Sequence, residues 1–220
     1  MQNPDGGWAA FDRQNDTKLV QSLPFCDFGE VLDPSSADVT AHVLELLGRL
    51  GYSRDEPHLA RGLAYLWGQR ELDGSWFGRW GVNYIYGTAA VLMALKELAF
   101  TAESEGVTGA VAWLRSRQNE DGGWGECCCS YEDATWHGRG PSSASQTAWA
   151  VLGLLAAGDR EVAGGGVRWL LERQSADGAW EEPYFTGTGF PGDFFIKYHE
   201  YRNYFPLLAL ARWKRLTSDE

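Results

Sequence analysis

Aromatic side chains are the residues of this chain whose number and spacing first suggest chemistry. The 220 residues include eleven Trp, nine Tyr and ten Phe, more than a core of this size ordinarily uses. Three segments combine aromatic residues with turns, and they cover residues 25–30, 80–86 and 186–195. A helically spaced stripe follows the third segment: Tyr198, Tyr201, Tyr204 and Phe205. Such a stripe is usually core, but three separate segments at the starts of predicted inner helices could line one cavity.

An aromatic cavity has a definite chemical use. The face of an aromatic ring stabilises a positive charge by roughly 0.5 to 2 kcal/mol per contact. It does so without reacting, whereas an exposed carboxylate or water would trap a carbocation. Aromatic packing without chemistry is the competing interpretation.

Asp38 and His42 are the acid–base pair of interest, because a spacing of four places them on one face of a helix. One interpretation is a capping Asp and a buried His whose hydrogen bonds are satisfied. The other is a charged His that orients and strengthens an acid elsewhere. The chain supplies no obvious proton donor, and it contains no Walker loop, Gly-x-Ser-x-Gly elbow, His-Glu-x-x-His or Asp-Asp-x-x-Asp box.

Charge and composition exclude several classes of partner. A net charge of -11 with only 19 Lys and Arg argues against nucleic acid, since phosphate binding needs concentrated basic residues. No run approaches the roughly 18 to 20 apolar residues of a membrane span, and no signal peptide is recognisable. We therefore expect a cytoplasmic protein, on or near a membrane at most. Adjacent cysteines do not easily satisfy the geometry of a disulfide, so we expect Cys127, Cys128 and Cys129 to be free thiols. A zinc site would need spaced Cys pairs with His, and only His137 lies nearby, so we expect no metal. We also expect no cofactor.

The chain is built from repeats. Asp-Gly-x-Trp occurs four times, beginning at Asp5, Asp73, Asp121 and Asp177, at intervals of roughly fifty residues. The last three copies follow amphipathic helices, and the third and fourth have Gln118 and Gln174 at the helix end. Asp-Gly predicts a sharp stop to the helix, the Gln amide could bond freed backbone groups, and the Trp could cover the helix end. The second copy has Arg70 at the Gln position, so we expect its turn to join the helices less tightly than the other turns do.

Helices richer in Ala, Leu and Val alternate with the amphipathic ones. They are predicted at Asp38–Leu50, Tyr84–Phe100, Ser145–Ala157 and Phe195–Leu216, with Ser35 or Ser36 and Ser142 or Ser143 as caps. No strong strand pattern is present. The alternation predicts an all-α fold in which inner and outer helices form an α/α toroid, and a linear helical solenoid is the alternative.

With these residues in view, the chain resembles the C-terminal part of a bacterial squalene-hopene cyclase, a class II triterpene cyclase, over nearly its full length. The Gln-to-Trp units resemble the QW motifs of that family. Four further stretches carry the resemblance: Pro24-Phe-Cys-Asp-Phe-Gly-Glu-Val, Asp38-Val-Thr-Ala-His42, Gly74-Ser-Trp-Phe-Gly-Arg-Trp-Gly-Val-Asn-Tyr and Gly187-Thr-Gly-Phe-Pro-Gly-Asp-Phe.

The resemblance implies a metal-free cyclisation of squalene to hopene and hopanol, started by protonation of a terminal double bond. His42 would hydrogen-bond the catalytic Asp, and Asp38 would belong to its supporting network. The substrate and its cations would be held by an aromatic set: Phe11, Trp80, Tyr86, Phe190, Phe194, Tyr198 and Tyr201. Asp12, Cys26 and Phe28 would border a substrate entrance that opens toward the membrane, with the protein peripheral (monotopic) at the inner membrane.

Two departures from the family pattern stand out. The proton-donor motif Asp-x-Asp-Asp is absent from these residues, and Phe11 stands where some relatives carry Tyr. Residues 1–220 are therefore expected to form a single, partial barrel domain that is inactive alone and could associate, for example as a homodimer, through its open edge. Two alternatives stay open: another class II terpene cyclase acting on oxidosqualene or a shorter prenyl chain, and a non-catalytic toroid that binds a lipid or serves as a scaffold.

Overall fold

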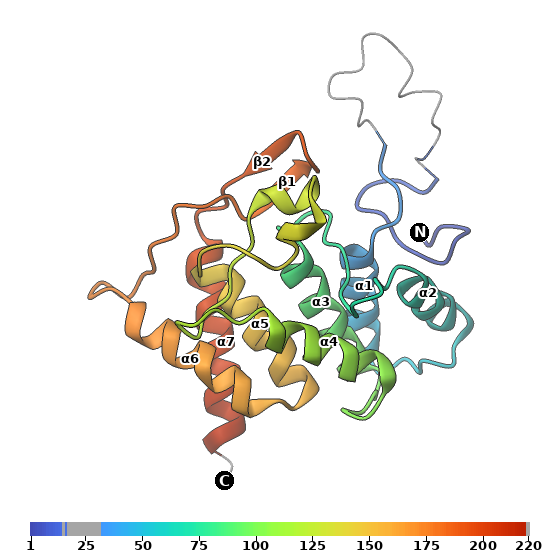
Figure 1. Cartoon of the computed structure of the whole chain (residues 1–220). Coiled ribbons are helices and arrows are strands. Elements are labelled where there is room, and N and C mark those ends of the chain that lie inside the picture. Colours follow the sequence, from blue (N-terminus) through green and yellow to red (C-terminus); the bar gives the residue numbers. More distant parts are fainter. Residues whose placement is uncertain (15, 17–31, 219–220) are drawn as a thin grey trace.

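The computed structural model describes residues 1–14, 16 and 32–218 (Figure 1). Within them the chain forms seven α-helices and one short hairpin. The bounds are α1 Ala37–Arg49, α2 Pro57–Gly68, α3 Tyr84–Glu97, α4 Glu105–Ser116, α5 Ala144–Ala157, α6 Arg160–Arg173 and α7 Tyr201–Ser218. Strands β1 (Gly187–Phe190) and β2 (Phe194–Ile196) pair antiparallel, and two 3-10 turns, η3 (Cys128–Tyr131) and η4 (Ala134–Trp136), precede α5. The all-α prediction is confirmed, with the hairpin as an addition that the sequence pattern did not predict.

The helices form two layers. α1, α3, α5 and α7 pack successively against one another, while α2, α4 and α6 pack on the outside of α1, α3 and α5. α3 and α5 are buried along most of their length, because they are apolar on nearly every face. These two helices form the centre of the core.

The inner helices curve back on themselves. Arg212 of α7 donates to the sulfur of Met93 in α3 at 3.4 Å and lies 3.9 Å from Glu45 of α1. The first and last inner helices of a linear solenoid would lie far apart, because each repeat contacts only its neighbours. The contact therefore favours the toroid over the linear alternative.

The repeat turns join the layers, and the Trp makes the helix-end bond that was expected of the Gln. Trp76, Trp124 and Trp180 each donate their indole N–H to a carbonyl at the end of the preceding outer helix, at 2.7 to 2.8 Å. Gln118 and Gln174 instead donate to the Gly carbonyl of their own turn, at 2.9 Å. In the second copy Arg70 stands at the Gln position and donates to Glu105 on α4. The bond from Gln to the Gly carbonyl therefore has no counterpart in that turn.

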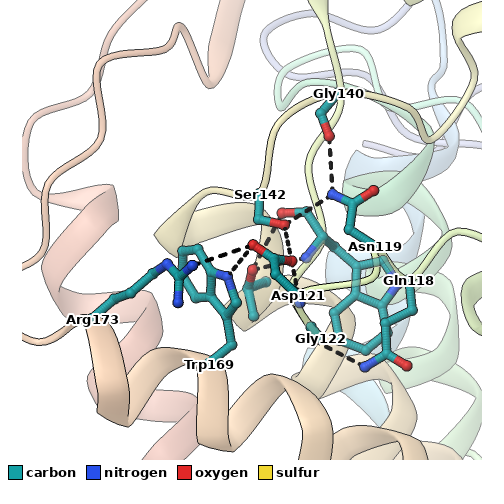
Figure 2. A network of polar contacts seen from close by, with 11 residues as sticks. Gln118, Asn119, Asp121, Gly122, Gly140, Ser142, Trp169 and Arg173 are labelled. Atoms are coloured by element: carbon teal, nitrogen blue, oxygen red, sulfur yellow. Dashed lines mark hydrogen bonds and ion pairs between the residues drawn. The ribbon is translucent and has the colours of Figure 1, made fainter.

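The turn at Asp121 shows how the outer helix α6 is attached to the turn before it (Figure 2). Asp121 accepts from the Gly123 amide and the Ser142 hydroxyl on one oxygen, and from the indole N–H of Trp169 in α6 on the other, at 2.7 Å. Trp113 of α4 makes the same bond to Asp73 at 2.8 Å. One aspartate thus closes its own turn and anchors the next outer helix.

Three local predictions need correction. The last inner helix begins at Tyr201 and not at Phe195, because residues 194–196 pair with β1. Ser36 and Ser143 occupy N-cap positions, but neither side chain makes a capping bond. Cys127 and Cys129 are paired as a disulfide and only Cys128 is free among these three, so the expectation of free thiols is wrong for two of them.

Candidate functional site

The residues predicted for the site gather at one end of the inner helices. In Figure 1 this is the end where the β1–β2 hairpin and the loop containing η3 and η4 lie, near the N-terminal segment. α1 contributes Asp38 and His42, the start of α3 contributes Tyr86, and the start of α7 contributes Tyr201. Segments far apart in the sequence therefore meet where inner helices begin.

His42 lies between a hydroxyl and a carboxylate. Its Nε2 is 2.9 Å from the hydroxyl of Tyr86, and its Nδ1 is 3.8 Å from Glu45 one turn along α1. Burial tends to raise the pKa of Glu45, but the His42 hydrogen bond and the charges of Arg49 and Arg212 outweigh it and lower the pKa. The expectation of a buried His is not met, since 45% of the His42 side chain is exposed.

Asp38 is fully buried and has a different set of partners. One carboxylate oxygen accepts from the Ser36 hydroxyl at 2.6 Å, and the other accepts from the backbone amide of Trp80 at 2.9 Å. The carbonyl of Trp80 in turn accepts from the amide of Thr188 in β1 at 3.1 Å. Asp38 thus positions the Trp80 backbone and, through it, the hairpin. Its role is to position other residues.

Aromatic rings continue inward from Tyr86. The Tyr86 ring lies 4.9 Å from Trp149 of α5, which in turn lies 5.9 Å from Tyr201 and 5.3 Å from Phe205. Tyr198 stacks on Tyr201 at 4.6 Å. We call these five rings the aromatic wall: Tyr86, Trp149, Tyr198, Tyr201 and Phe205. Burial, followed by the charge of Asp38, holds the pKa of Tyr86 well above its usual value, so its hydroxyl stays neutral.

Trp80 and the hairpin border this wall. The ring of Tyr198 lies directly over Gly187, where a Cβ would come 2.5 Å from Tyr198 and 3.3 Å from the Trp80 carbonyl. Phe190 and Phe194 face each other across the hairpin as a register pair. Glycine at 187 is therefore what lets Tyr198 and the Trp80 segment approach each other.

The N-terminal residues predicted for the site lie at its margin. Phe11 packs edge-on against Trp80 at 5.6 Å, and Asp33 accepts from the amides of Ala10, Phe11 and Asp12. Phe11 is 66% exposed and Phe194 is 48% exposed, so both border an open side of the site. Cys26 and Phe28 lie outside the described residues.

Sequence reasoning missed three residues that build the site: Trp149, Phe205 and Asp33. Trp149 lies inside a helix that reads as uniformly apolar, and no motif marks it as the ring that joins Tyr86 to Tyr201. Phe205 belongs to the stripe after the hairpin, and its spacing there is equally typical of a core residue. Among the described residues, no group of three or more His, Cys, Asp or Glu could hold a metal ion.

Comparison with known proteins identifies the family. The family model of the squalene-hopene cyclase C-terminal domain matches residues 1–215. The chain is 52% identical over 217 residues to the squalene–hopene cyclase of Alicyclobacillus acidocaldarius, covering 98% of this chain and 34% of that enzyme. It is 47% identical over 239 residues to the dammaradiene synthase of Dryopteris crassirhizoma, covering 97% of this chain and 35% of the relative.

The solved structures agree on the fold. The type II terpene cyclase MstE from Scytonema superposes with a TM-score of 0.60 at 20% identity, covering 98% of this chain and 64% of that one. This likeness concerns the fold alone, and the chain spans about a third of the length of the curated relatives it matches. The match over residues 1–215 shows that the chain belongs to the squalene-hopene cyclase family and corresponds to its C-terminal domain.

Proposed function

We propose that this chain is the C-terminal domain of a triterpene cyclase that converts squalene to hopene and hopanol by proton-initiated polycyclisation. The observation that carries the proposal is the contact of His42 with Tyr86, the first ring of the aromatic wall, which leads on through Trp149 to Tyr201. An acid-orienting group thus lies directly beside a row of rings that suits a migrating positive charge. A metal or redox cofactor has no role in this proposal.

The proposal divides the work between His42 and the aromatic wall. His42 would orient and strengthen an acid supplied by another segment of the enzyme, because these 220 residues contain no Asp-x-Asp-Asp. Tyr86, Trp149, Tyr201 and Tyr198 would then stabilise successive cations through their ring faces. Since the Tyr86 hydroxyl stays neutral, it would not offer an anion that could trap the carbocation.

A location at the membrane surface is part of the proposal, because squalene is a hydrocarbon that dissolves in lipid. We place the enzyme on the cytoplasmic side of the inner membrane as a peripheral (monotopic) protein, with the entrance near Asp12, Cys26 and Phe28. The exposed ring of Phe11 beside Asp12 supports an apolar margin there. None of the described helices combines the length and apolar character needed to span a bilayer.

The test uses a chimera in which this chain replaces the matching third of the Alicyclobacillus enzyme. We expect the chimera to convert squalene to hopene and hopanol, detected by gas chromatography and mass spectrometry. His42→Ala should abolish turnover, whereas Tyr201→Ala should lower the rate and change the product spectrum, since removal of a ring leaves a cation without one of its supports. Unchanged rate and products in both variants would contradict the assignment.

Another class II cyclase activity is the second candidate, because a dammaradiene synthase is nearly as similar to this chain as the squalene–hopene cyclases are. Offering the chimera squalene and oxidosqualene in parallel separates the two. A preference for oxidosqualene, or a product other than hopene and hopanol, would favour the second candidate.

A further inference from the structure

Two buried glutamates occupy the same place in consecutive repeats. Glu126 and Glu182 each stand two residues after the repeat Trp, and each is almost completely buried. At the same place in the first two repeats stand Ala10 and Gly78, which have no side chain that could accept a hydrogen bond. The glutamates are therefore a feature of the third and fourth turns.

Each glutamate caps an inner helix from outside that helix. Glu126 accepts from the backbone amides of Asn83 at 3.3 Å and Ile85 at 2.9 Å, at the start of α3. Glu182 accepts from the amide and the hydroxyl of Ser145, at 2.9 and 2.6 Å, at the start of α5. The first amides of a helix have no partner within it, and a carboxylate is the acceptor that suits them best. The loop glutamates replace the capping side chains that α3 and α5 lack.

The turn that Glu126 holds is the one that presents Tyr86. Tyr86 directly follows Ile85, and its hydroxyl lies 2.9 Å from His42 Nε2. Backbone at Gly78 and Gly81 packs tightly on the Tyr86 ring, since a Cβ at either position would come within 2.8 Å of it. A shift of the first turn of α3 would therefore move the hydroxyl relative to His42, because the ring has little freedom to compensate.

Side chains of η3 tie the segments around Glu126 together. The Asn83 side chain donates to the Ser130 hydroxyl at 3.1 Å, and the Tyr131 hydroxyl donates to the carbonyls of Gly78 and Gly81. Burial raises the pKa of the Glu126 carboxyl, and hydrogen bonds from backbone amides offset part of that rise. The acceptor oxygen that faces the start of α3 is therefore held by the fold.

We propose that Glu126 is a positioning residue of the cyclase site, which sets the Tyr86 hydroxyl against His42 by fixing the first turn of α3. This inference rests on the proposed function. Glu182 makes the equivalent cap on α5 and does not hold the turn that carries Tyr86, so it serves as the matched control.

The test compares Glu126→Ala, Glu126→Gln and Glu182→Ala in the chimera, each with and without Tyr86→Phe. We expect Glu126→Ala to lower kcat by up to about tenfold, no more than Tyr86→Phe does, with little change in KM, because a misplaced group costs rate more than binding. Glu126→Gln keeps an acceptor oxygen and should restore most of the rate. In the Tyr86→Phe background Glu126→Ala should add less than about a twofold loss, whereas the effect of Glu182→Ala should persist in full.

Several results would overturn the proposal. One such result is an equal loss of kcat in Glu126→Ala and Glu182→Ala. Another is a Glu126→Ala loss of kcat that is as large in the Tyr86→Phe background as in the native one. Either result would show that Glu126 is only a structural cap. If Glu126→Ala does not fold, Glu126→Asp takes its place, since it keeps the charge but lacks the reach. Glu126→Asp should then lower kcat, and an unchanged kcat would overturn the role.

The failure of the proposed function is distinguishable from the failure of this inference. A folded chimera with native Glu126 and no turnover of any triterpene substrate would overturn the function. The positioning role is then tested by NMR spectroscopy of the imidazole nitrogens of His42. Glu126→Ala should shift them in the same direction as Tyr86→Phe does, and an unchanged spectrum would overturn the role.

Discussion

At the residue scale, the contact between Tyr86 and His42 is the feature most open to test. Tyr86→Phe removes the hydroxyl and keeps the ring. We expect kcat of the chimera to fall about tenfold with KM little changed, because the variant loses one hydrogen bond to His42 and no substrate-binding surface. Steady-state kinetics with squalene measures both constants. A raised KM with kcat unchanged would show that the hydroxyl serves only to bind substrate.

Glu45 provides a second prediction at this scale, through pH. Its folded pKa lies below the ordinary 4.5, so its ionised form stabilises the fold at pH above that value. This stability should be lost as the pH falls through the lowered pKa, when the carboxylate that faces His42, Arg49 and Arg212 becomes neutral. Chemical unfolding of the chimera between about pH 6 and pH 3 should show the loss. Glu45→Gln should flatten this part of the profile, and an identical profile would contradict the assignment.

The sequence predicted which residues belong to the site better than it predicted their contacts. His42 and Tyr86 were both selected, but nothing in a spacing of forty-four residues says that they touch. Asp38 was expected beside His42 because the two share a helix face, yet its oxygens bond Ser36 and the Trp80 amide. Trp149 was missed because a ring within an apolar helix carries no local signal. Contacts of this kind depend on tertiary packing, which periodicity does not encode.

At the element scale, the repeat turn is predicted to be a joint between helices. Asp121→Ala removes acceptors for the Gly123 amide, the Ser142 hydroxyl and the Trp169 indole, so we expect a loss of about 1–2 kcal/mol in the free energy of unfolding. Asp177→Ala is the control, because Asp177 bonds only Ser175 and Ala179 within its own turn and is exposed. Urea unfolding of the two chimera variants compares them. Equal losses would argue against the anchoring of α6 by Asp121.

The same scale shows where local patterns mislead. The four Asp-Gly-x-Trp units and the first three inner helices follow from short-range signals, and the predicted bounds of α1, α3 and α5 differ from the observed ones by a few residues at most. The segment from Phe195 to Glu200 reads as helix because it contains Tyr198, the first residue of the stripe that continues with Tyr201 and Tyr204. It is partly strand because the turn at Gly192 brings it back onto β1, which also bonds the Trp80 segment. Pairing with a segment more than a hundred residues away is not visible in a local pattern.

At the scale of the whole molecule, the isolated chain is predicted to be inactive. Its 220 residues contain no Asp-x-Asp-Asp that could start the reaction, and large rings such as Phe11 and Phe194 are exposed at the site. Incubation of the purified chain with squalene, followed by mass spectrometry of the extract, should therefore yield no hopene. Formation of hopene would mean that another acid among these residues can protonate the substrate.

The most direct test of the proposed chemistry is the cyclisation of squalene by the chimera in deuterated water. An exchangeable acid oriented by His42 should deliver a single deuteron to the terminal double bond, so the hopene should be heavier by one deuterium. The same chimera with His42→Ala should form no labelled product. Unlabelled hopene, or labelled hopene at an undiminished rate from the His42→Ala variant, would contradict the account.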